Sequence, residues 1–299
     1  MKLAGYGEDR LVRELTRQLG RGVNVRVGIG DDCAAIGRPM AALWRLLKTD
    51  CIIEGVHFLK SADPRKVGWK ALSRALSDIA AMGGLPECAL VTIAAPREME
   101  VAWVKGFYAG LRRAAEKFGV VIAGGETARS PGPFFCSVAL TGMVERKRCI
   151  TRSGGRDGDA LYVTGRLGGS IGGKHLEFTP RIAEARWLTQ HFKPHAMMDL
   201  SDGLGSDLPR LAQASGCGFV VYKEKIPVTR GCTTRNALAD GEDYELLFAM
   251  PARDEKQLTR LEAAWKKRFP KLPLTRIGEL NCKSQIANRK SPHGFDHYA

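Results

Sequence analysis

Residues 64–84 read PRKVGWKALSRALSDIAAMGG, and this stretch decides the fold of the first half of the chain. Apolar side chains recur here every three or four residues, which predicts an amphipathic helix over residues 64–82. Pro64 suits the first turn of a helix, and the glycine pair after Met82 ends it. The helix is predicted to bury one apolar stripe, made of Val67, Ala71, Leu72, Ala75, Ile79 and Met82.

Asp78 lies inside this predicted helix, close to the apolar stripe. A carboxylate beside an apolar face is costly unless it has a partner. One interpretation is an ion pair with Arg74, one helical turn earlier. The other is a bound metal ion, which this position favours more than an average position in a helix does.

Further strands and helices are predicted on both sides of this helix. They are strands at residues 41–49, 51–53, 88–94, 120–123 and 134–144, and helices at residues 8–19 and 98–118. Strands that alternate with helices in this way predict an α/β protein built in layers.

The second half of the chain repeats the alternation. A charged stretch before residue 149 marks the boundary, so we expect one α/β domain over residues 1–148 and another over residues 149–299. In the second domain the predicted strands are at residues 160–164, 218–222, 244–249 and 274–280, with a further strand that ends at Asp199, and the helices are at residues 181–192, 203–214 and 254–268.

The composition is that of a folded protein. Of the 299 residues, 44% are hydrophobic and 26% are charged, which argues against a disordered chain or a coiled coil. No run of about 18 apolar residues and no apolar signal core occurs, so we expect a cytoplasmic protein without membrane contact. The 8 cysteines include no Cys-x-x-Cys pair, so we expect reduced thiols rather than a zinc site.

The net charge of +14 suggests anionic partners, either nucleic acids or phosphorylated small molecules. Zinc-finger spacing and aromatic RNA-binding motifs are both missing from the sequence, so we expect no nucleic-acid partner.

Acidic residues gather in four loops next to predicted strands. These are Asp31-Asp32 after Gly28-Ile-Gly, Thr49-Asp50, Asp199-Leu-Ser201-Asp202, and Asp240-Gly-Glu242-Asp243-Tyr-Glu245. Each one alone fits a turn or a helix cap. Together they supply many carboxylate oxygens, which suit Mg²⁺ ions that bridge substrate phosphates.

Two other patterns approach known ligand sites without fitting them. Residues 168–174, GGSIGGK, follow a strand like a P-loop but lack its final hydroxyl residue. The pairs His191/His195 and His293/His297 have the spacing of metal ligands on a helix, but a proline or a glycine lies inside each pair. We expect these histidines to be structural or on the surface.

The order of the loops resembles that of the thiamine-monophosphate kinases, a family of the aminoimidazole ribonucleotide synthetase superfamily. The resemblance spans the whole chain. It rests on Gly28-Ile-Gly-Asp-Asp32, Thr49-Asp50, Glu54-Gly-Val-His-Phe58, Leu76-Ser-Asp-Ile-Ala-Ala-Met-Gly83, Gly124-Gly-Glu-Thr127, Thr151-Arg-Ser-Gly154, Asp199-Leu-Ser-Asp-Gly203, Gly241-Glu-Asp-Tyr-Glu-Leu246 and Gly294-Phe-Asp-His-Tyr298.

The resemblance implies a two-domain fold with mixed sheets and packed helices, a homodimer formed through the N-terminal domain, and an active site between the domains. It further implies direct transfer of the γ-phosphoryl group of ATP to thiamine monophosphate, giving thiamine diphosphate. The alternatives are a related ATP-using enzyme of the same fold and a nucleotide-binding homologue without catalytic activity.

The resemblance also implies roles for individual residues. Several Mg²⁺ ions would contact Asp32, Thr49, Asp50, Asp78, Glu126, Asp199 and Asp202. The nucleotide would contact Tyr108, Gly125, Arg152 and Ser201. Thiamine monophosphate would contact His57, Glu242 and Phe295. No side chain is predicted as a catalytic acid, base or nucleophile, because positioning and metal ions carry the reaction.

Lys48 departs from the family pattern, which commonly has a hydroxyl residue there as a magnesium position. Its ammonium group could replace one Mg²⁺ ion beside Thr49 and Asp50. Alternatively, alternation along the strand turns its side chain away from the site, since Lys48 and Thr49 point to opposite faces. We expect the second arrangement.

Overall fold

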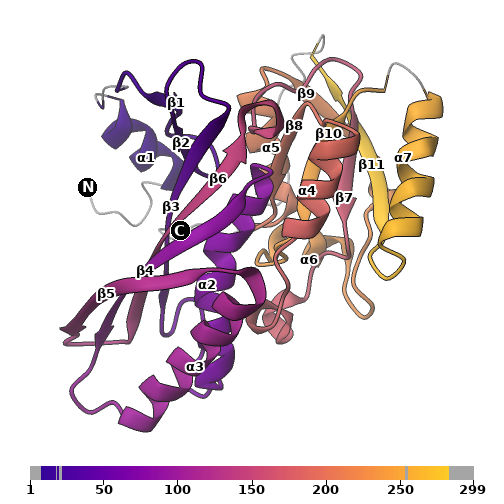
Figure 1. The fold of residues 1–299 in the computed structure, drawn as a ribbon. Coiled ribbons are helices and arrows are strands. Elements are labelled where there is room, and N and C mark those ends of the chain that lie inside the picture. Colours follow the sequence, from indigo (N-terminus) through magenta and orange to yellow (C-terminus); the bar gives the residue numbers. More distant parts are fainter. Residues whose placement is uncertain (1–7, 18, 20–21, 253–254, 283–299) are drawn as a thin grey trace.

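The computed structural model describes residues 8–17, 19, 22–252 and 255–282 (Figure 1). The predicted substrate contact Phe295 and the pair His293/His297 lie outside the described residues. In the described part the chain forms two α/β units, each built around one sheet, which confirms the predicted fold class.

The first sheet comes from residues before 146. Its strands are β1 (Val25–Val27), β2 (Ala34–Ile36), β3 (Leu43–Ile53), β4 (Leu85–Ala95), β5 (Val121–Arg129) and β6 (Phe135–Glu145). They lie in the order β1-β2-β3-β6-β4-β5. The sheet is mixed, because β4 and β5 run parallel while the neighbouring pairs are antiparallel.

The second sheet comes from residues after 159. Its strands are β7 (Ala160–Thr164), β8 (Ala196–Asp199), β9 (Gly218–Val221), β10 (Leu246–Met250) and β11 (Leu274–Asn281). They lie in the order β8-β10-β7-β11-β9, and the four pairings between them are antiparallel.

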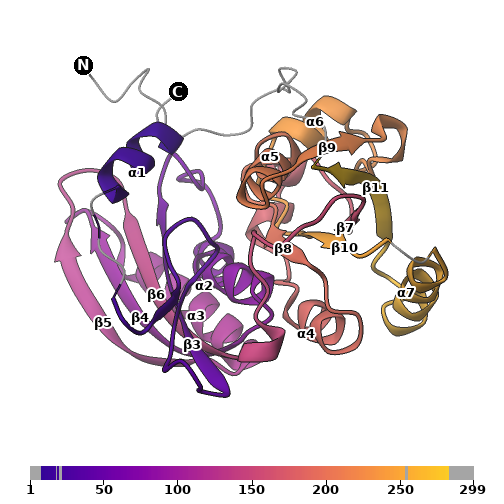
Figure 2. The same ribbon diagram turned by 90° about the horizontal axis from the view of Figure 1, so that it is seen from above.

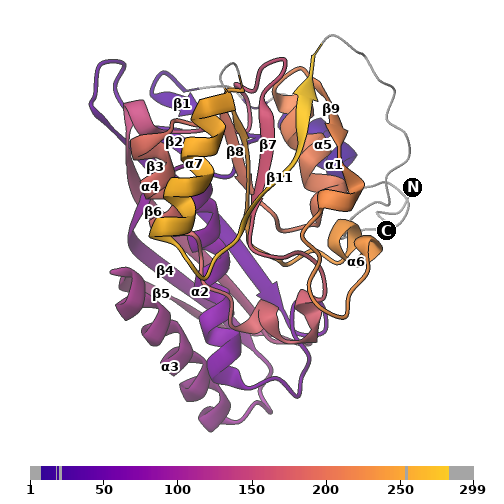
Figure 3. The same cartoon turned by 90° about the vertical axis from the view of Figure 1, so that its right-hand side faces the viewer.

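Helices cover these sheets. They are α1 (Glu8–Thr16), α2 (Pro64–Ala81), α3 (Val101–Phe118), α4 (Ile182–His191), α5 (Leu204–Ala214), α6 (Thr234–Ala239) and α7 (Glu255–Arg268). Short 3-10 helices are η1 (Arg146–Arg148), η2 (Ser170–Gly172), η3 (Lys174–Leu176) and η4 (Lys223–Lys225). Helices α4 and α7 lie on one side of the second sheet and α5 and α6 on the other (Figure 3). No helix in the described part of the chain is long and apolar enough to cross a membrane.

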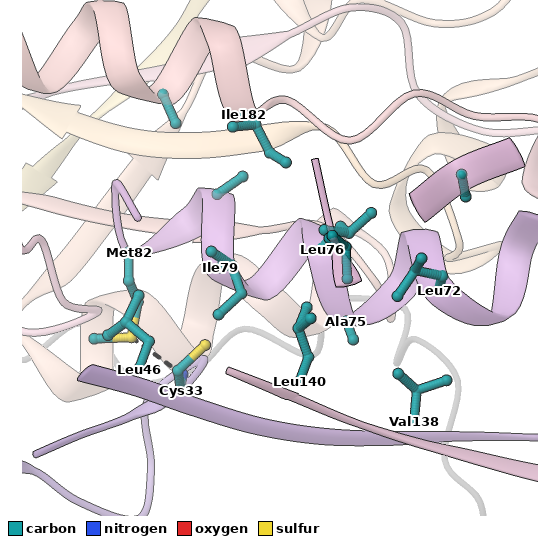
Figure 4. Close-up of a cluster of buried hydrophobic side chains, with 14 of the residues drawn as sticks. Cys33, Leu46, Leu72, Ala75, Leu76, Ile79, Met82, Val138, Leu140 and Ile182 are labelled. Carbon is teal, nitrogen blue, oxygen red and sulfur yellow. Dashed lines mark hydrogen bonds between the residues drawn. The ribbon is translucent and has the colours of Figure 1, made fainter. Parts of the chain in front are cut away.

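Helix α2 is the centre of the molecule, because it lies between the first sheet and the second unit (Figure 2). Its apolar side chains pack against Leu46 on β3 and Leu140 on β6, and Ile182 of α4 approaches from the opposite side (Figure 4). The predicted apolar stripe of α2 is buried along its whole length. The polar side of the helix is buried as well, including Lys70 and Asp78. Polar groups on α2 therefore need partners from both units.

An ion pair also joins the two units near the end of α2. Arg186 on α4 donates two hydrogen bonds to the carboxylate of Glu145 at the end of β6, at 2.5 and 2.8 Å. The same guanidinium group donates to the carbonyl oxygen of Gly83 at 2.9 Å. The Arg186 hydrogen bonds lower the pKa of Glu145 to about 2. The pair fixes α4 against the first unit.

The predicted helices and most of the longer strands are confirmed, with boundaries that differ by a few residues. The two strands predicted at residues 41–49 and 51–53 are one strand, β3, and the strand predicted at residues 120–123 extends to Arg129 in β5. One expectation was wrong: the cysteines are not all reduced, because Cys217 and Cys282 form a disulfide across a separation of 65 residues. The two residues meet because antiparallel pairing places Asn281, at the end of β11, opposite Gly218, at the start of β9.

Candidate functional site

Three carboxylates from distant parts of the sequence meet between the two units. Asp32 comes from the loop before β2, Asp78 from α2 and Asp199 from the end of β8. One ligand oxygen of each lies within 4.8 Å of the others, and the three side chains are buried. Oδ2 of Asp32 is buried without a hydrogen-bond partner. Carboxylate oxygens in this arrangement form a candidate site for a divalent cation.

The electrostatics of these carboxylates fit that interpretation. Burial, together with the charge of Asp32, raises the pKa of Asp199 to about 6, although a 2.6 Å hydrogen bond from Ser77 Oγ opposes the shift. Burial also raises the pKa of Asp78, and the charge of Asp199 adds to the rise. Burial thus destabilises the charged forms of these carboxylates, and a bound cation would stabilise them.

The chain supplies its own cations to several of these carboxylates. Lys48 Nζ lies 2.8 Å from Asp78 Oδ1, and Arg152 lies 2.6 Å from Asp32 Oδ1. Asp50 accepts from Arg74, and this guanidinium group and Lys48 lower the pKa of Asp50 against the effect of burial.

One expectation about these pairs was wrong, and one alternative interpretation does not hold. The side chain of Lys48 does not turn away from the site, and Asp78 does not pair with Arg74. Residues 46 and 52 of β3 are buried against α2, so strand alternation also points Lys48 and Asp50 toward the helix. Thr49 is the residue on the opposite face, where its Oγ1 lies 3.3 Å from Ser137 Oγ.

The other predicted metal ligands lie apart from the cluster of three. Glu126 is an exposed residue of the edge strand β5, and its carboxylate accepts from its neighbour Thr127. Asp202 forms an ion pair with Arg210 of α5. The roles of Thr49, Asp50, Glu126 and Asp202 as metal ligands stay predictions.

The predicted nucleotide contacts occupy two regions. Arg152 and Ser201 lie near the carboxylate cluster: the Arg152 side chain binds Asp32, and its backbone N–H donates to Asp31 Oδ1 at 3.1 Å. Tyr108 lies on α3, and Gly125 lies on β5. A Cβ atom at position 125 would lie 1.8 Å from the carbonyl oxygen of Val91, so the close approach of β4 requires glycine there.

A pocket of about 400 Å³ opens beside the carboxylate cluster. Both units contribute to its walls, which are mostly apolar with charged groups at one side. The lining includes Val56, His57, Phe58, Leu59 and Arg74 from the first unit, and Ile171, His175, Leu176, Ser201, Asp202, Glu242 and Tyr244 from the second. Two of the predicted substrate contacts, His57 and Glu242, thus line one cavity.

A buried lysine organises the charged side of this pocket. Lys70 Nζ donates to the carbonyl oxygen of His57 at 2.6 Å and to Glu242 at 2.7 Å, and it lies 2.7 Å from Nδ1 of His175. The same Nδ1 atom of His175 lies 2.9 Å from the carboxylate of Glu242, to which it donates when protonated. Burial lowers the pKa of Lys70 to about 8. Hydrogen bonds from His175 and Lys70 outweigh the effect of burial and lower the pKa of Glu242 to about 2.

The backbone is strained at the same place. Glu242 and Tyr244 have φ angles of 55° and 51°, in the left-handed region that residues other than glycine rarely adopt. This conformation costs about 1–2 kcal/mol per residue. Strain of this kind concentrates at functional sites, where surrounding contacts hold it.

Pocket and cluster are connected along α2. Lys70, Arg74 and Asp78 follow one another at intervals of four residues and therefore lie on one stripe of the helix. Arg74 lies in the middle and contacts both Asp50 and Glu242, at 3.2 and 3.5 Å. Sequence reasoning missed Lys70 and His175 as site residues, although the four-residue spacing of charged groups on α2 was a usable signal.

The glycine-rich segment at residues 168–174 does not act as a P-loop in this structure. Its backbone N–H groups already donate to protein carboxylates: Gly168 to Asp243 at 2.9 Å, and Gly169 to Asp240 at 2.8 Å. Carboxylates thus fill the places that phosphate oxygens take in a P-loop. The segment instead anchors the acidic loop that carries Glu242.

Family comparisons agree with this architecture. The model for the AIR synthase related protein N-terminal domain matches residues 30–144, and the model for the C-terminal domain matches residues 156–281. Fold and site therefore define an AIR synthase related protein.

Within this class the chain is similar to two thiamine-monophosphate kinases. It is 35% identical to that of Rhodopirellula baltica, over 95% of this chain and 92% of the relative. It is 34% identical to that of Aquifex aeolicus, over the full length of both. A solved structure described as AaThiL complexed with AMPPCP and TMP matches with a TM-score of 0.84 and 34% identity, over 99% of both chains. The chain belongs to the thiamine-monophosphate kinase family.

Proposed function

We propose that this protein transfers the γ-phosphoryl group of ATP to thiamine monophosphate, giving thiamine diphosphate and ADP. The observation that carries the proposal is the stripe Lys70-Arg74-Asp78, which connects a pocket to a carboxylate cluster. Family membership supplies the identity of the substrates, because similar proteins are named for this activity. We also propose that the reaction takes place in the cytoplasm, where ATP is available as the phosphate donor.

The chemistry needs cations more than it needs a base. The acceptor is a phosphate oxygen with a second pKa near 6, so it is already largely anionic at neutral pH. The difficulty is to bring two polyanions together, which requires positioning and charge neutralisation. Arg74 lines the pocket and Arg152 pairs with Asp32 of the cluster, so the two guanidinium groups would face the two phosphate groups.

Mg²⁺ fits the carboxylate cluster. The donors are all hard oxygen atoms, and the unpartnered Oδ2 of Asp32 is a free ligand position. Asp32, Asp78 and Asp199 would hold the metal, which when bound supplies positive charge to the phosphates of the nucleotide. Asp50 and Asp202 would contribute after release from Arg74 and Arg210, and Thr49 and Glu126 are the remaining proposed ligands.

The proposed substrate contacts follow from the pocket. Its apolar walls suit the rings of thiamine, and His57 and Glu242 lie on its charged side. We place the nucleotide against Arg152 and Ser201 at the cluster, with Tyr108 and Gly125 as further contacts. Phe295 completes the proposed set.

The first prediction tests the acceptor. With Mg-ATP, thiamine monophosphate is expected to yield thiamine diphosphate, whereas free thiamine is expected to give less than about 1% of that rate, because the proposed chemistry relies on an acceptor that is already anionic and a neutral hydroxyl group would need a general base. Chromatography of the products and ADP release measure both reactions. Equal turnover of thiamine, or no product from the monophosphate, would contradict the proposal.

We propose further that the protein is a homodimer that pairs through the open face of the first sheet. The face opposite α2 and α3 exposes large apolar side chains, namely Leu43, Leu47, Leu85, Leu90, Val121 and Met143. Strand pairing places these residues on one surface, since Leu85 lies opposite Met143 and Leu90 opposite Ala139. An exposed apolar surface of this kind is typical of a subunit interface.

The second prediction tests this interface. Leu90→Asp puts a charge into the middle of the apolar face, so it is expected to shift the protein from dimer to monomer in sedimentation experiments. Val101→Asp is the matched control, because Val101 is also exposed but lies at the start of α3. A Leu90→Asp protein that sediments as the unsubstituted protein does would argue against this surface.

A further inference from the structure

We infer that the ammonium group of Lys48 is a resident cation of the carboxylate cluster and takes the place of one divalent metal ion. The chain would then bind one metal ion fewer than the same chain with threonine at position 48. The inference rests on the proposed Mg²⁺ site, but it concerns metal binding and not turnover.

Lys48 is built into the cluster. It lies on β3 in the same alternation as Leu46, which is fully buried, so its stem is held between the sheet and α2. Its side chain is 23% exposed and that of Asp78 is 9% exposed. Nζ lies 2.8 Å from Oδ1 of Asp78, which is the distance of a charge-assisted hydrogen bond.

The ammonium group competes directly with a metal ion. A Mg²⁺ ion bound to an Asp78 oxygen would lie about 2.1 Å from it. A divalent ion on Oδ1 would therefore stand close to Nζ in a site with little water, where repulsion between like charges is strong. The other oxygen of Asp78, with Asp32 and Asp199, remains for one metal ion.

The charges of the cluster lead to the same conclusion. Asp32, Asp50 and Asp78 have Arg152, Arg74 and Lys48 as internal partners. Asp199 accepts a hydrogen bond from a neutral group, the hydroxyl of Ser77. The four carboxylates thus face three cationic side chains. Of these, Lys48 is the one that pairs with Asp78, the member of the cluster of three that lies on α2.

Lysine replaces the charge of a metal ion but not its coordination. An ammonium group has three donors and no vacant ligand position, so it cannot bridge a carboxylate to a phosphate. It can still donate a hydrogen bond to a phosphate oxygen. The consequence is a site that keeps its charge balance with fewer metal ions.

The test counts bound metal. Mn²⁺ replaces Mg²⁺ as a paramagnetic probe in the presence of saturating AMPPCP. The electron paramagnetic resonance signal of free Mn²⁺ then gives, by difference, the number of ions bound per chain. Lys48→Thr is expected to bind one Mn²⁺ more than the unsubstituted protein. Lys48→Gln is the second variant and is expected to gain the same ion, because its amide oxygen is neutral and can bind a metal.

The matched control is Lys66→Thr. Lys66 is also a lysine paired with a carboxylate, but its partner Glu177 and its own side chain are largely exposed, and it lies outside the cluster. Loss of one positive charge there is expected to leave the Mn²⁺ count unchanged. A gain of equal size in Lys66→Thr would attribute the effect to net charge and overturn the inference.

A second readout is stability without nucleotide. In EDTA, Lys48→Thr is expected to melt at a lower temperature than the unsubstituted protein, since three buried carboxylates lose a cation. Mg²⁺ is expected to raise the melting temperature of the variant and so to remove the difference. An unchanged Mn²⁺ count in folded Lys48→Thr and Lys48→Gln would overturn the inference. Failure of the proposed kinase reaction would show instead as missing turnover with the metal counts as stated.

Discussion

Asp78→Asn is expected to lower kcat/KM for thiamine monophosphate by at least about 100-fold, a loss of about 2.7 kcal/mol in transition-state stabilisation. The amide keeps the shape of the side chain but removes one negative charge from the cluster of three carboxylates. It also removes the charged partner of Lys48 at 2.8 Å, so both the metal and the lysine face a neutral amide oxygen in place of a carboxylate.

The same change is expected to leave folding intact. The amide no longer repels Asp199 and Asp32, which offsets the lost ion pair with Lys48. The free energy of unfolding in urea is therefore expected to change by no more than about 1 kcal/mol. Loss of activity with preserved stability would separate a role in the reaction from a role in the fold.

Asp63→Asn is the control for this substitution. Asp63 is on the same helix but caps its N-terminus, where its exposed side chain accepts from the N–H of Arg65 at 2.8 Å. Asparagine caps helices about as well as aspartate does, so activity and stability are expected to stay near normal. Near-normal turnover of Asp78→Asn would mean that the carboxylate serves only to pair with Lys48.

Much of the fold could be predicted because its long elements have clear periodicity. The apolar stripe of α2 predicted a helix over residues 64–82, and the structure has Pro64–Ala81. Elements such as α6, β1 and β2 were missed because six or three residues are too few to show a period. The disulfide between Cys217 and Cys282 left no local signal, since it depends on strand pairing across 65 residues.

The orientation of Lys48 shows where reasoning about the site failed. The alternation along β3 is the expected one, but the expectation has the wrong phase: the family pattern, with Thr49 among the metal ligands, favours Thr49 as the inward residue. The apolar residues decide the phase: Leu46 and Ile52 are 0% and 1% exposed, so the even-numbered positions between them face α2. Burial of apolar side chains outweighs the preference of a hydroxyl group for a polar site.

The meeting of Asp32, Asp78 and Asp199 could be predicted only in part. Each acidic loop was visible, and the family pattern implied that they share metal ions. Their separation of 46 and 121 residues along the chain means that only the packing of α2 between the two units brings them together. Long-range packing of this kind is not encoded in any local pattern.

Lys70→Met is expected to lower the free energy of unfolding by about 3–5 kcal/mol, which is typical when one member of a buried ion pair is removed. Lys70 is 0% exposed and joins the first unit to Glu242 of the second. Methionine has a similar length but no donors, so the carbonyl oxygen of His57 and the carboxylate of Glu242 each lose a hydrogen bond. Equilibrium urea unfolding measures the change.

Two comparisons make this expectation specific to the ion pair. Lys66→Met alters the preceding turn of α2, but Lys66 and its partner Glu177 are 41% and 51% exposed, so a change within about 0.5 kcal/mol is expected. The double variant Lys70→Met with Glu242→Gln is expected to be more stable than the sum of the single effects predicts, by about 1 kcal/mol or more, because no carboxylate is left unpaired. Strict additivity, or a Lys70→Met effect no larger than that of Lys66→Met, would mean that Arg74 and His175 hold Glu242 without help from the lysine.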